Sequence, residues 1–251
     1  MKSSNISSKT LFKDYILNWY MTYKYQYHAE TTRSVQLVYI NVHIRPSKLG
    51  RMHLCEIRTI HIQNFFNELL TNGNKTHLKN NNSAGKGLGG WTVKKIRALI
   101  ISALKQAYKE HLIFSNYAED TESISIPAAQ YYIFSVKQQR LFFNDLERTS
   151  YRYTLMFKLY FTTGARRSEI AGLTWEDVLW DQNCINICKT VVIINGKPIL
   201  KDIPKTRTSI RTQPLPVPIM QELRQWKRQQ INEAKEYGPK WKNYDGTIAE
   251  W

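Results

Sequence analysis

Two short segments of this 251-residue chain carry side chains whose types and spacing could act together on an anion. In Thr163-Gly164-Ala165-Arg166-Arg167-Ser168-Glu169, an arginine stands at the start of a short amphipathic helix, just past a Thr-Gly turn. In Pro204-Lys205-Thr206-Arg207-Thr208-Ser209-Ile210-Arg211, a lysine stands at a turn between two predicted strands. A planar guanidinium can donate two parallel hydrogen bonds to one oxyanion, and an ammonium is both a donor and an acid. The two segments therefore predict a single site that faces a negatively charged group.

The order and spacing of these segments resemble the first two active-site motifs of the tyrosine recombinases, the phage-integrase family, which cut and rejoin DNA. Residues 31–50 and 92–107 are similar to helices of the family's core-binding domain, and the resemblance extends to about residue 236. In that family two arginines clamp the non-bridging oxygens of the scissile phosphate while a tyrosine attacks it. The resemblance implies that Arg166 is the first of these arginines, that Lys205 protonates the departing 5′ oxygen, and that Glu169 supports the site.

Both assignments have competitors in the sequence. Arg167 cannot share the role of Arg166, because one helical step rotates a side chain by about 100°. The motif register selects Arg166; without that register, a surface arginine paired with Glu169 would be the ordinary explanation. Two other lysines of the same predicted hairpin compete with Lys205, which is favoured because the residues after it fit the family pattern.

Further basic residues are candidates for contacts with DNA. By the resemblance, the second and fourth helices of the first domain approach the major groove, and a solvated helical face is the alternative. On the hairpin we expect phosphate contacts, although solvated charges at a strand edge explain the same residues nearly as well. The candidates are Arg33, Lys94, Lys95 and Arg97 in the first domain, and Arg207 and Arg211 in the second.

The later motifs of the family are missing from this sequence. None of its six histidines is followed three residues later by arginine, and none comes after His111. Tyr237 and Tyr244 follow the hairpin too closely to be the nucleophile, so surface or packing roles are expected for them. We therefore expect a recombinase truncated before its His-x-x-Arg motif and its nucleophilic tyrosine. Since catalytic residues act as a unit, this chain alone is not expected to cleave DNA.

Charge points to the same kind of partner. The formal net charge is +16, and both halves of the chain are basic: 17 Lys and Arg against 8 Asp and Glu in residues 1–127, and 19 against 12 in residues 128–251. Such a distribution suits a protein that encircles a polyanion, and counterion release would make its binding to duplex DNA strongly salt-dependent. The alternative is a merely soluble basic protein.

Other classes are disfavoured by composition. No apolar run is long enough to predict a transmembrane helix, and the polar N-terminus favours a cytoplasmic location. Three cysteines are too few for a disulfide framework and lack zinc-finger spacing. Cys184 and Cys188 are expected to be a buried pair of small hydrophobes rather than a metal site. Neither a metal nor another cofactor is implied, because the phosphotyrosine link of the family conserves bond energy.

Residues 1–115 are predicted to form a helical core-binding (SAM-like) domain. Apolar periodicity predicts helices over residues 9–27, 31–42, 59–70 and 92–111, with a glycine-rich loop over 73–90. In the second helix, Thr31 or Thr32 is expected as the cap, with a buried stripe of valines and Tyr39. In the third, Thr59 is expected as the cap, and six apolar residues from Ile60 to Leu70 are expected to be largely buried.

Residues 116–139 are predicted to be a linker, and residues 140–251 the N-terminal part of a catalytic domain. Helices are predicted over residues 144–152, 154–162 and 219–236, and a short one starts at Arg166. Residues 184–194 are β-rich, Asn195-Gly196 predicts a hairpin turn, and strands are expected over 197–203 and 209–215. The predicted fold class is mainly α with a small antiparallel β-meander: a helical core-binding domain followed by a partial α+β catalytic domain.

These observations favour an integrase-type site-specific recombinase of a mobile element that acts on duplex DNA. The alternative of another class is a non-catalytic DNA-binding protein, derived from an integrase, that occupies recombination sites. An unrelated basic RNA-binding protein would leave the Arg166 and Lys205 motifs without a reason. By the resemblance, the full-length form is expected to be a tetramer on DNA and the present chain a monomer by itself.

Overall fold

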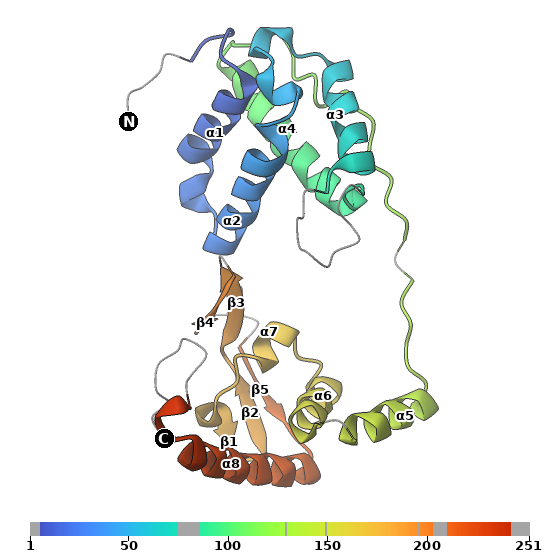
Figure 1. Ribbon diagram of the computed structural model, residues 1–251, viewed down its shortest axis with the longest axis vertical. Helices are drawn as coiled ribbons and strands as arrows, with labels where there is room; N and C mark the ends of the chain where they lie inside the picture. Colours follow the sequence, from blue (N-terminus) through green and yellow to red (C-terminus); the bar gives the residue numbers. More distant parts are fainter. Residues whose placement is uncertain are drawn as a thin grey trace. The chain divides into compact units, whose positions relative to one another are not determined.

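A computed structural model of the chain describes residues 6–74, 86–128, 130–148, 150–194, 196–202 and 210–241 (Figure 1). The chain divides into two compact units, Met1–Gln130 and Tyr131–Trp251. This division lies inside the segment that the sequence assigned to a linker. Residues of that segment up to Thr121 nevertheless belong to the core region of the first unit, since Ala118 is fully buried and Thr121 nearly so.

The first unit is a bundle of helices. Its apolar core is built mainly by α1 and α4, whose buried faces carry Trp19, Tyr20, Ile96 and Ile100 among others. In the fourth helix, the apolar residues that recur at the 3.6-residue period from Val93 to Ala107 are all buried, in agreement with the predicted periodicity. The helices are α1 (Phe12–Tyr23), α2 (Glu30–Val38), α3 (Thr59–Asn72) and α4 (Gly90–Lys109), with short 3₁₀ turns at Tyr25–Tyr27, Leu49–Arg51 and Leu54–Glu56.

The second helix differs from its prediction in both its start and its buried face. It begins at Glu30 after Ala29, with no side-chain cap, so the capping role of Thr31 or Thr32 was wrong. The chain then widens into a π-helical turn, Tyr39–Ile44, in which the N–H of Arg45 donates to the carbonyl of Ile40 at 2.9 Å. The core contacts come from this wide turn, and α2 itself buries none of its residues. The predicted valines, Val35, Val38 and Val42, are 46%, 47% and 39% exposed rather than buried.

Thr59 was predicted to cap the third helix, but the N-cap is Arg58 and Thr59 is the first helical residue. Four of its six predicted core residues are buried, whereas Ile60 and Leu70 are exposed. Part of the glycine-rich loop, residues 75–85, lies outside the described residues. At its described ends, the N–H of Asn74 donates to the carbonyl of Lys86 at 2.9 Å and that of Leu88 to the carbonyl of Leu69 at 2.8 Å.

The second unit combines helices with two small antiparallel sheets, which confirms the predicted fold class. The three-stranded sheet has the order β1-β2-β5, and β3 and β4 form a separate hairpin. Its helices are α5 (Val136–Glu147), α6 (Tyr151–Thr163), α7 (Arg167–Ile170) and α8 (Val217–Tyr237), with 3₁₀ turns at Trp175–Asp177 and Gly238–Lys240. Its strands are β1 (Val178–Leu179), β2 (Cys184–Ile187), β3 (Thr190–Ile194), β4 (Lys197–Lys201) and β5 (Arg211–Pro214).

The predicted hairpin is confirmed by the pairing of Ile194 with Lys197 across the turn, in which Gly196 has a φ of +79°. The preceding β-rich segment is two strands rather than one, because the chain leaves the first sheet after Ile187 and enters the hairpin at Thr190. The final helix is also confirmed: it follows Pro216 and ends at Tyr237, with Gly238 as its C-cap. Cys184 and Cys188 are half-buried rather than buried.

The first helix of this unit starts earlier than predicted. Ser135 caps it, since its hydroxyl accepts from the N–H of Gln138 at 3.4 Å while the Gln138 amide oxygen accepts from the N–H of Ser135 at 2.9 Å. This Ser-x-x-Gln capping box is a sequence signal that the periodicity argument overlooked. The helix ends at Glu147, so the break before α6 comes about five residues earlier than predicted.

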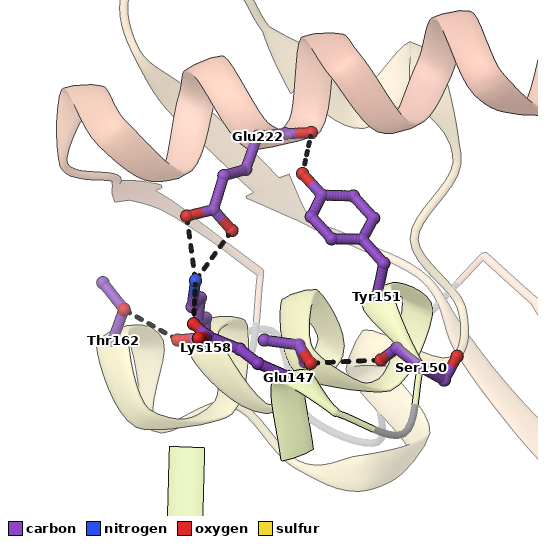
Figure 2. A network of polar contacts seen from close by, with 7 residues as sticks. Glu147, Ser150, Tyr151, Lys158, Thr162 and Glu222 are labelled. Atoms are coloured by element: carbon purple, nitrogen blue, oxygen red, sulfur yellow. Dashed lines mark hydrogen bonds and ion pairs between the residues drawn. The ribbon is translucent and has the colours of Figure 1, made fainter. Parts of the chain in front are cut away.

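An ion-pair network joins α6 to α8, the helix that follows β5. The ammonium of Lys158 donates to both carboxylate oxygens of Glu222, at 2.9 and 3.1 Å, and these two contacts can be followed in Figure 2. The hydroxyl of Tyr151 donates to the backbone carbonyl of Glu222 at 3.2 Å, and Glu147 lies 3.6 Å from Lys158. These contacts fix the helix whose C-terminal end leads directly to Arg166.

Replacing Lys158 by methionine is expected to lower the free energy of unfolding of the second unit by about 1–3 kcal/mol. The mostly buried Glu222 would lose its charged partner, whereas the methionine keeps the volume of the lysine stem. Equilibrium urea unfolding measures the difference. Arg148→Met is the control, because Arg148 and Asp145 are almost fully exposed and 4.0 Å apart. Equal stabilities of the two variants would contradict the role given to Lys158.

Candidate active site

A glycine turn brings Arg166 to the start of a helix. Gly164 ends α6 in the left-handed conformation, with a φ of +61°, and its N–H donates to the carbonyl of Tyr160 at 2.9 Å. The hydroxyl of Thr163 accepts from the N–H of Ala165 at 3.1 Å. Helix α6 therefore ends at Thr163, and Arg166, three residues later, is the N-cap of α7. The predicted Thr-Gly turn and the predicted position of Arg166 both agree with this geometry.

Glu169 is the centre of the site. One carboxylate oxygen accepts from Nη1 of Arg166 at 2.6 Å; the other accepts from the backbone N–H of Arg166 at 2.9 Å and from Nη2 of Arg211 at 3.0 Å. The side chain of Glu169 is only 3% exposed, that of Arg211 is 31% exposed and that of Arg166 is 71% exposed. A buried carboxylate thus holds two arginines, one of which reaches into solvent.

Burial and hydrogen bonding act on the pKa of Glu169 in opposite directions. Desolvation favours the neutral acid and works to raise its pKa. The hydrogen bonds from the Arg166 backbone, from Arg211 and from the Arg166 side chain favour the carboxylate, and together they hold the pKa of Glu169 below its ordinary value. Glu169 therefore carries a negative charge at neutral pH.

The structure brings together some of the predicted site residues but does not describe all of them. Arg166, Glu169 and Arg211 meet, while Arg167 projects from the next position and is exposed. Lys205 and Arg207 lie outside the described residues, so the placement of the lysine relative to Arg166 stays a prediction. The contact between Glu169 and Arg211 was not foreseen. The two residues are 42 positions apart, and no local spacing relates them.

A second buried carboxylate supports the chain that follows α7. Asp177 accepts from the N–H and the hydroxyl of Thr174, both at 2.8 Å. The ammonium of Lys189 lies 3.3 Å from Asp177 and donates to the hydroxyl of Thr174 at 2.9 Å, and the thiol of Cys188 donates to Asp177 at 3.3 Å. Burial works to raise the pKa of Asp177, but the hydrogen bonds from Thr174, Cys188 and Lys189 together hold it below its ordinary value. Thr-x-x-Asp is a capping-box spacing that could have predicted this anchor.

In the first unit, the predicted DNA-contacting residues fall into two groups. Arg33 and Arg97 make internal bonds: Nε of Arg33 donates to the carbonyl of Tyr25 at 2.7 Å, and Nε of Arg97 donates to the hydroxyl of Thr121 at 2.9 Å. These structural roles were missed by reasoning from the sequence. Lys94 and Lys95 are exposed on α4, and the ammonium of Lys94 lies 5.3 Å from the centre of the exposed Trp91 ring.

Two further observations concern the described residues only. They contain no group of three His, Cys, Asp or Glu side chains arranged to hold a metal ion. Within the same part of the chain, no helix has the length and apolar character needed to cross a membrane.

The two halves of the chain match two models of one family. The model of the phage integrase family matches residues 133–241, and the model of the phage integrase N-terminal SAM-like domain matches residues 11–70. The chain belongs to the phage integrase family of tyrosine recombinases.

Curated relatives agree with this assignment. The chain is 24% identical over 209 residues to a tyrosine recombinase XerC-like protein of Caldanaerobacter subterraneus subsp. tengcongensis, covering 78% of this chain and 50% of that protein. It is 27% identical over 193 residues to the prophage integrase IntR of Escherichia coli K12, covering 71% and 43%. The chain therefore spans about half the length of the curated relatives it matches.

Solved structures share the fold. The integrase of transposon Tn1549, in complex with a circular intermediate DNA, is similar with a TM-score of 0.69 and 14% identity, covering 86% of this chain and 64% of that one. A lambda integrase dimer bound to a COC′ core site is similar with a TM-score of 0.59 and 15% identity, covering 96% and 59%. At these identities the likeness shows the fold alone.

Proposed function

We propose that this chain is the DNA-binding integrase of a mobile element, and that its second unit holds part of the site for tyrosine transesterification. In this proposal Arg166 clamps the scissile phosphate and Lys205 protonates the departing 5′ oxygen. The observation that carries it is the cluster in which the buried Glu169 holds Arg166 at a helix start with most of its side chain in solvent.

The chemistry of the cluster fits a phosphate. A guanidinium has five N–H donors in a rigid fork, so Arg166 can bind Glu169 through Nη1 and still present other donors to phosphate oxygens. Those hydrogen bonds strengthen as negative charge develops on the oxygens in the transition state. Because the sequence contains no His-x-x-Arg motif, we expect the 251-residue chain by itself to bind DNA without cleaving it.

Support for DNA as the partner comes from charge and from relatives. Both halves of the chain are basic, and Lys94 and Lys95 are exposed on one helix of the first unit. The Tn1549 and lambda integrases, whose folds are similar, were solved in complex with DNA. We propose that Lys94 and Lys95 contact DNA phosphates, and that Arg33 and Arg97 contribute mainly by holding the first unit together.

The test is binding of fluorescent duplex DNA from the ends of candidate mobile elements, followed by anisotropy over a range of salt concentrations. Lys94→Ala and Lys95→Ala are each expected to weaken binding about fivefold and to reduce the salt slope by about one, as loss of one phosphate contact does. Arg166→Ala is expected to leave the affinity nearly intact, because its contact strengthens in the transition state rather than on binding.

Lys109→Ala is the matched control. Lys109 is exposed on the same helix but about 21 Å along its axis from Lys95, at a rise of about 1.5 Å per residue. Affinity equal to that of the wild type is expected for this variant. The proposal fails if the wild-type chain shows no salt-dependent binding to duplex DNA.

A further inference from the structure

We propose that Arg211 is a positioning residue for Arg166 and acts through the shared carboxylate of Glu169. This replaces the expectation that Arg211 contacts a DNA phosphate directly. The inference rests on the proposed function, because it gives Arg211 its importance through the phosphate-binding role of Arg166.

The position of Arg211 is set by the sheet. It is the first residue of β5 and pairs with Ile187 at the end of β2. From there its Nη2 reaches the same oxygen of Glu169 that accepts from the backbone N–H of Arg166. The strand and the start of α7 therefore both donate hydrogen bonds to the same carboxylate.

The charges explain why a second arginine matters. Glu169 and Arg166 alone form a neutral pair, which would offer little net attraction to a phosphate. With Arg211 the cluster carries a net charge of +1, because two guanidinium groups share one carboxylate. Arg211 also occupies one oxygen of Glu169, so that Arg166 is not drawn fully onto the carboxylate.

Among the described residues, the elements that pack on α7 bring few other charged groups toward Glu169. Strand β3 carries only threonine, valine and isoleucine. Helix α6 carries two cations, Arg152 and Lys158, and Lys158 is paired with Glu222 and Glu147. Among the described charged groups, Arg166 and Arg211 are therefore the ones that favour the carboxylate of Glu169 against the opposing effect of burial.

The experiment follows the Nε resonance of Arg166 by NMR in the full 251-residue chain labelled with ¹⁵N-arginine, between pH 3 and 7. Arg166→Lys assigns the signal by its disappearance. In the wild type the signal should move when Glu169 takes up a proton. The midpoint of this pH-dependent movement is expected to rise by about one pH unit or more in Arg211→Met, since a cation beside the carboxylate is lost. Arg211→Lys should restore most of the shift.

Arg148→Met is the control, because Arg148 is almost fully exposed on another part of the unit. The midpoint of the Arg166 signal in this variant should equal that of the wild type. If Arg211→Met does not fold, Arg211→Gln replaces it, because glutamine keeps a hydrogen-bond donor without the charge. The same rise in midpoint is expected for this variant. A midpoint unchanged in the folded, uncharged variant would overturn the inference.

Titration with inorganic phosphate at pH 7 separates this inference from the proposed function. Phosphate should shift the Arg166 signal in the wild type, and about tenfold more phosphate should be needed in Arg211→Met. No shift in the wild type would count against a phosphate role for Arg166, while the midpoint would still report whether Arg211 acts on Glu169. Equal phosphate affinities in the two proteins would instead count against Arg211 as a positioning residue.

Discussion

Replacing Glu169 by glutamine is expected to lower the free energy of unfolding of the second unit at pH 7 by about 2–3 kcal/mol. The glutamine has nearly the same shape, but one of its two terminal atoms is an NH₂ group that cannot accept a hydrogen bond. Three donors now converge on the two oxygens of Glu169, two of them from arginine side chains. Hydrogen bonds to a charged group contribute about 1.5–3 kcal/mol each, and the solvent exposure of Arg166 reduces its share.

The pH dependence of this effect has a definite sign. The folded-state pKa of Glu169 is held below its ordinary value, so the stabilisation is fully present above the ordinary pKa of a glutamate. It is lost as the pH falls through the folded-state pKa. The difference in the free energy of unfolding between the wild type and Glu169→Gln should therefore be constant from pH 7 to about 5.5 and should shrink below about pH 4.

Equilibrium urea unfolding at pH 7, 5.5 and 3.5 measures this difference. Glu236→Gln, at an exposed position near the end of α8, is the control and should match the wild type at each pH. A Glu169→Gln difference as large at pH 3.5 as at pH 7 would show that shape, rather than charge, makes Glu169 important.

Gly50→Ala should destabilise the first unit by about 3 kcal/mol. A methyl group on Gly50 would overlap the carbonyl oxygen of Ile44 and lie 2.8 Å from that of Arg45. These are backbone atoms, which cannot rotate away as the end of a side chain can. The turn is also held by Ser47, whose hydroxyl donates to the carbonyl of Ile44 at 2.6 Å and accepts from the N–H of Gly50 at 3.0 Å. Forcing atoms into such a site costs about 1–3 kcal/mol or more.

Gly89→Ala is the matched control for this change. Nothing lies within 4 Å of the place where its methyl group would be, so only the modest loss at a helix N-cap is expected, within about 1 kcal/mol. Thermal unfolding of both variants, followed by circular dichroism, gives the comparison. If both lose the same stability, the close approach of the backbone at Gly50 does not constrain the turn.

Local signals predicted much of the fold. The positions of α4 and α8 were predicted to within about two residues from apolar periodicity and from helix start and stop signals. The hairpin followed from the residues of its turn. In each case the information lies within one element, because side-chain periodicity and turn conformation depend on near neighbours.

Other features could not be predicted in this way. The buried face after α2 is set by the π-helical turn, which inserts an extra residue and rotates the side chains that follow. The break between β2 and β3 depends on which strand each one pairs with, and β2 finds its partner in β5, more than twenty residues later. Such pairings reflect long-range packing, which no local pattern records.

The same distinction holds at the candidate site. The sequence by itself determined the family resemblance, the basic character of both halves and the place of Arg166 at a helix start, because motif order, charge and the glycine turn are local properties. Only the tertiary structure decided that Arg211 meets Glu169. That contact needs β5 to pair with β2 and α7 to pack beside them, so it exists only once the unit has folded.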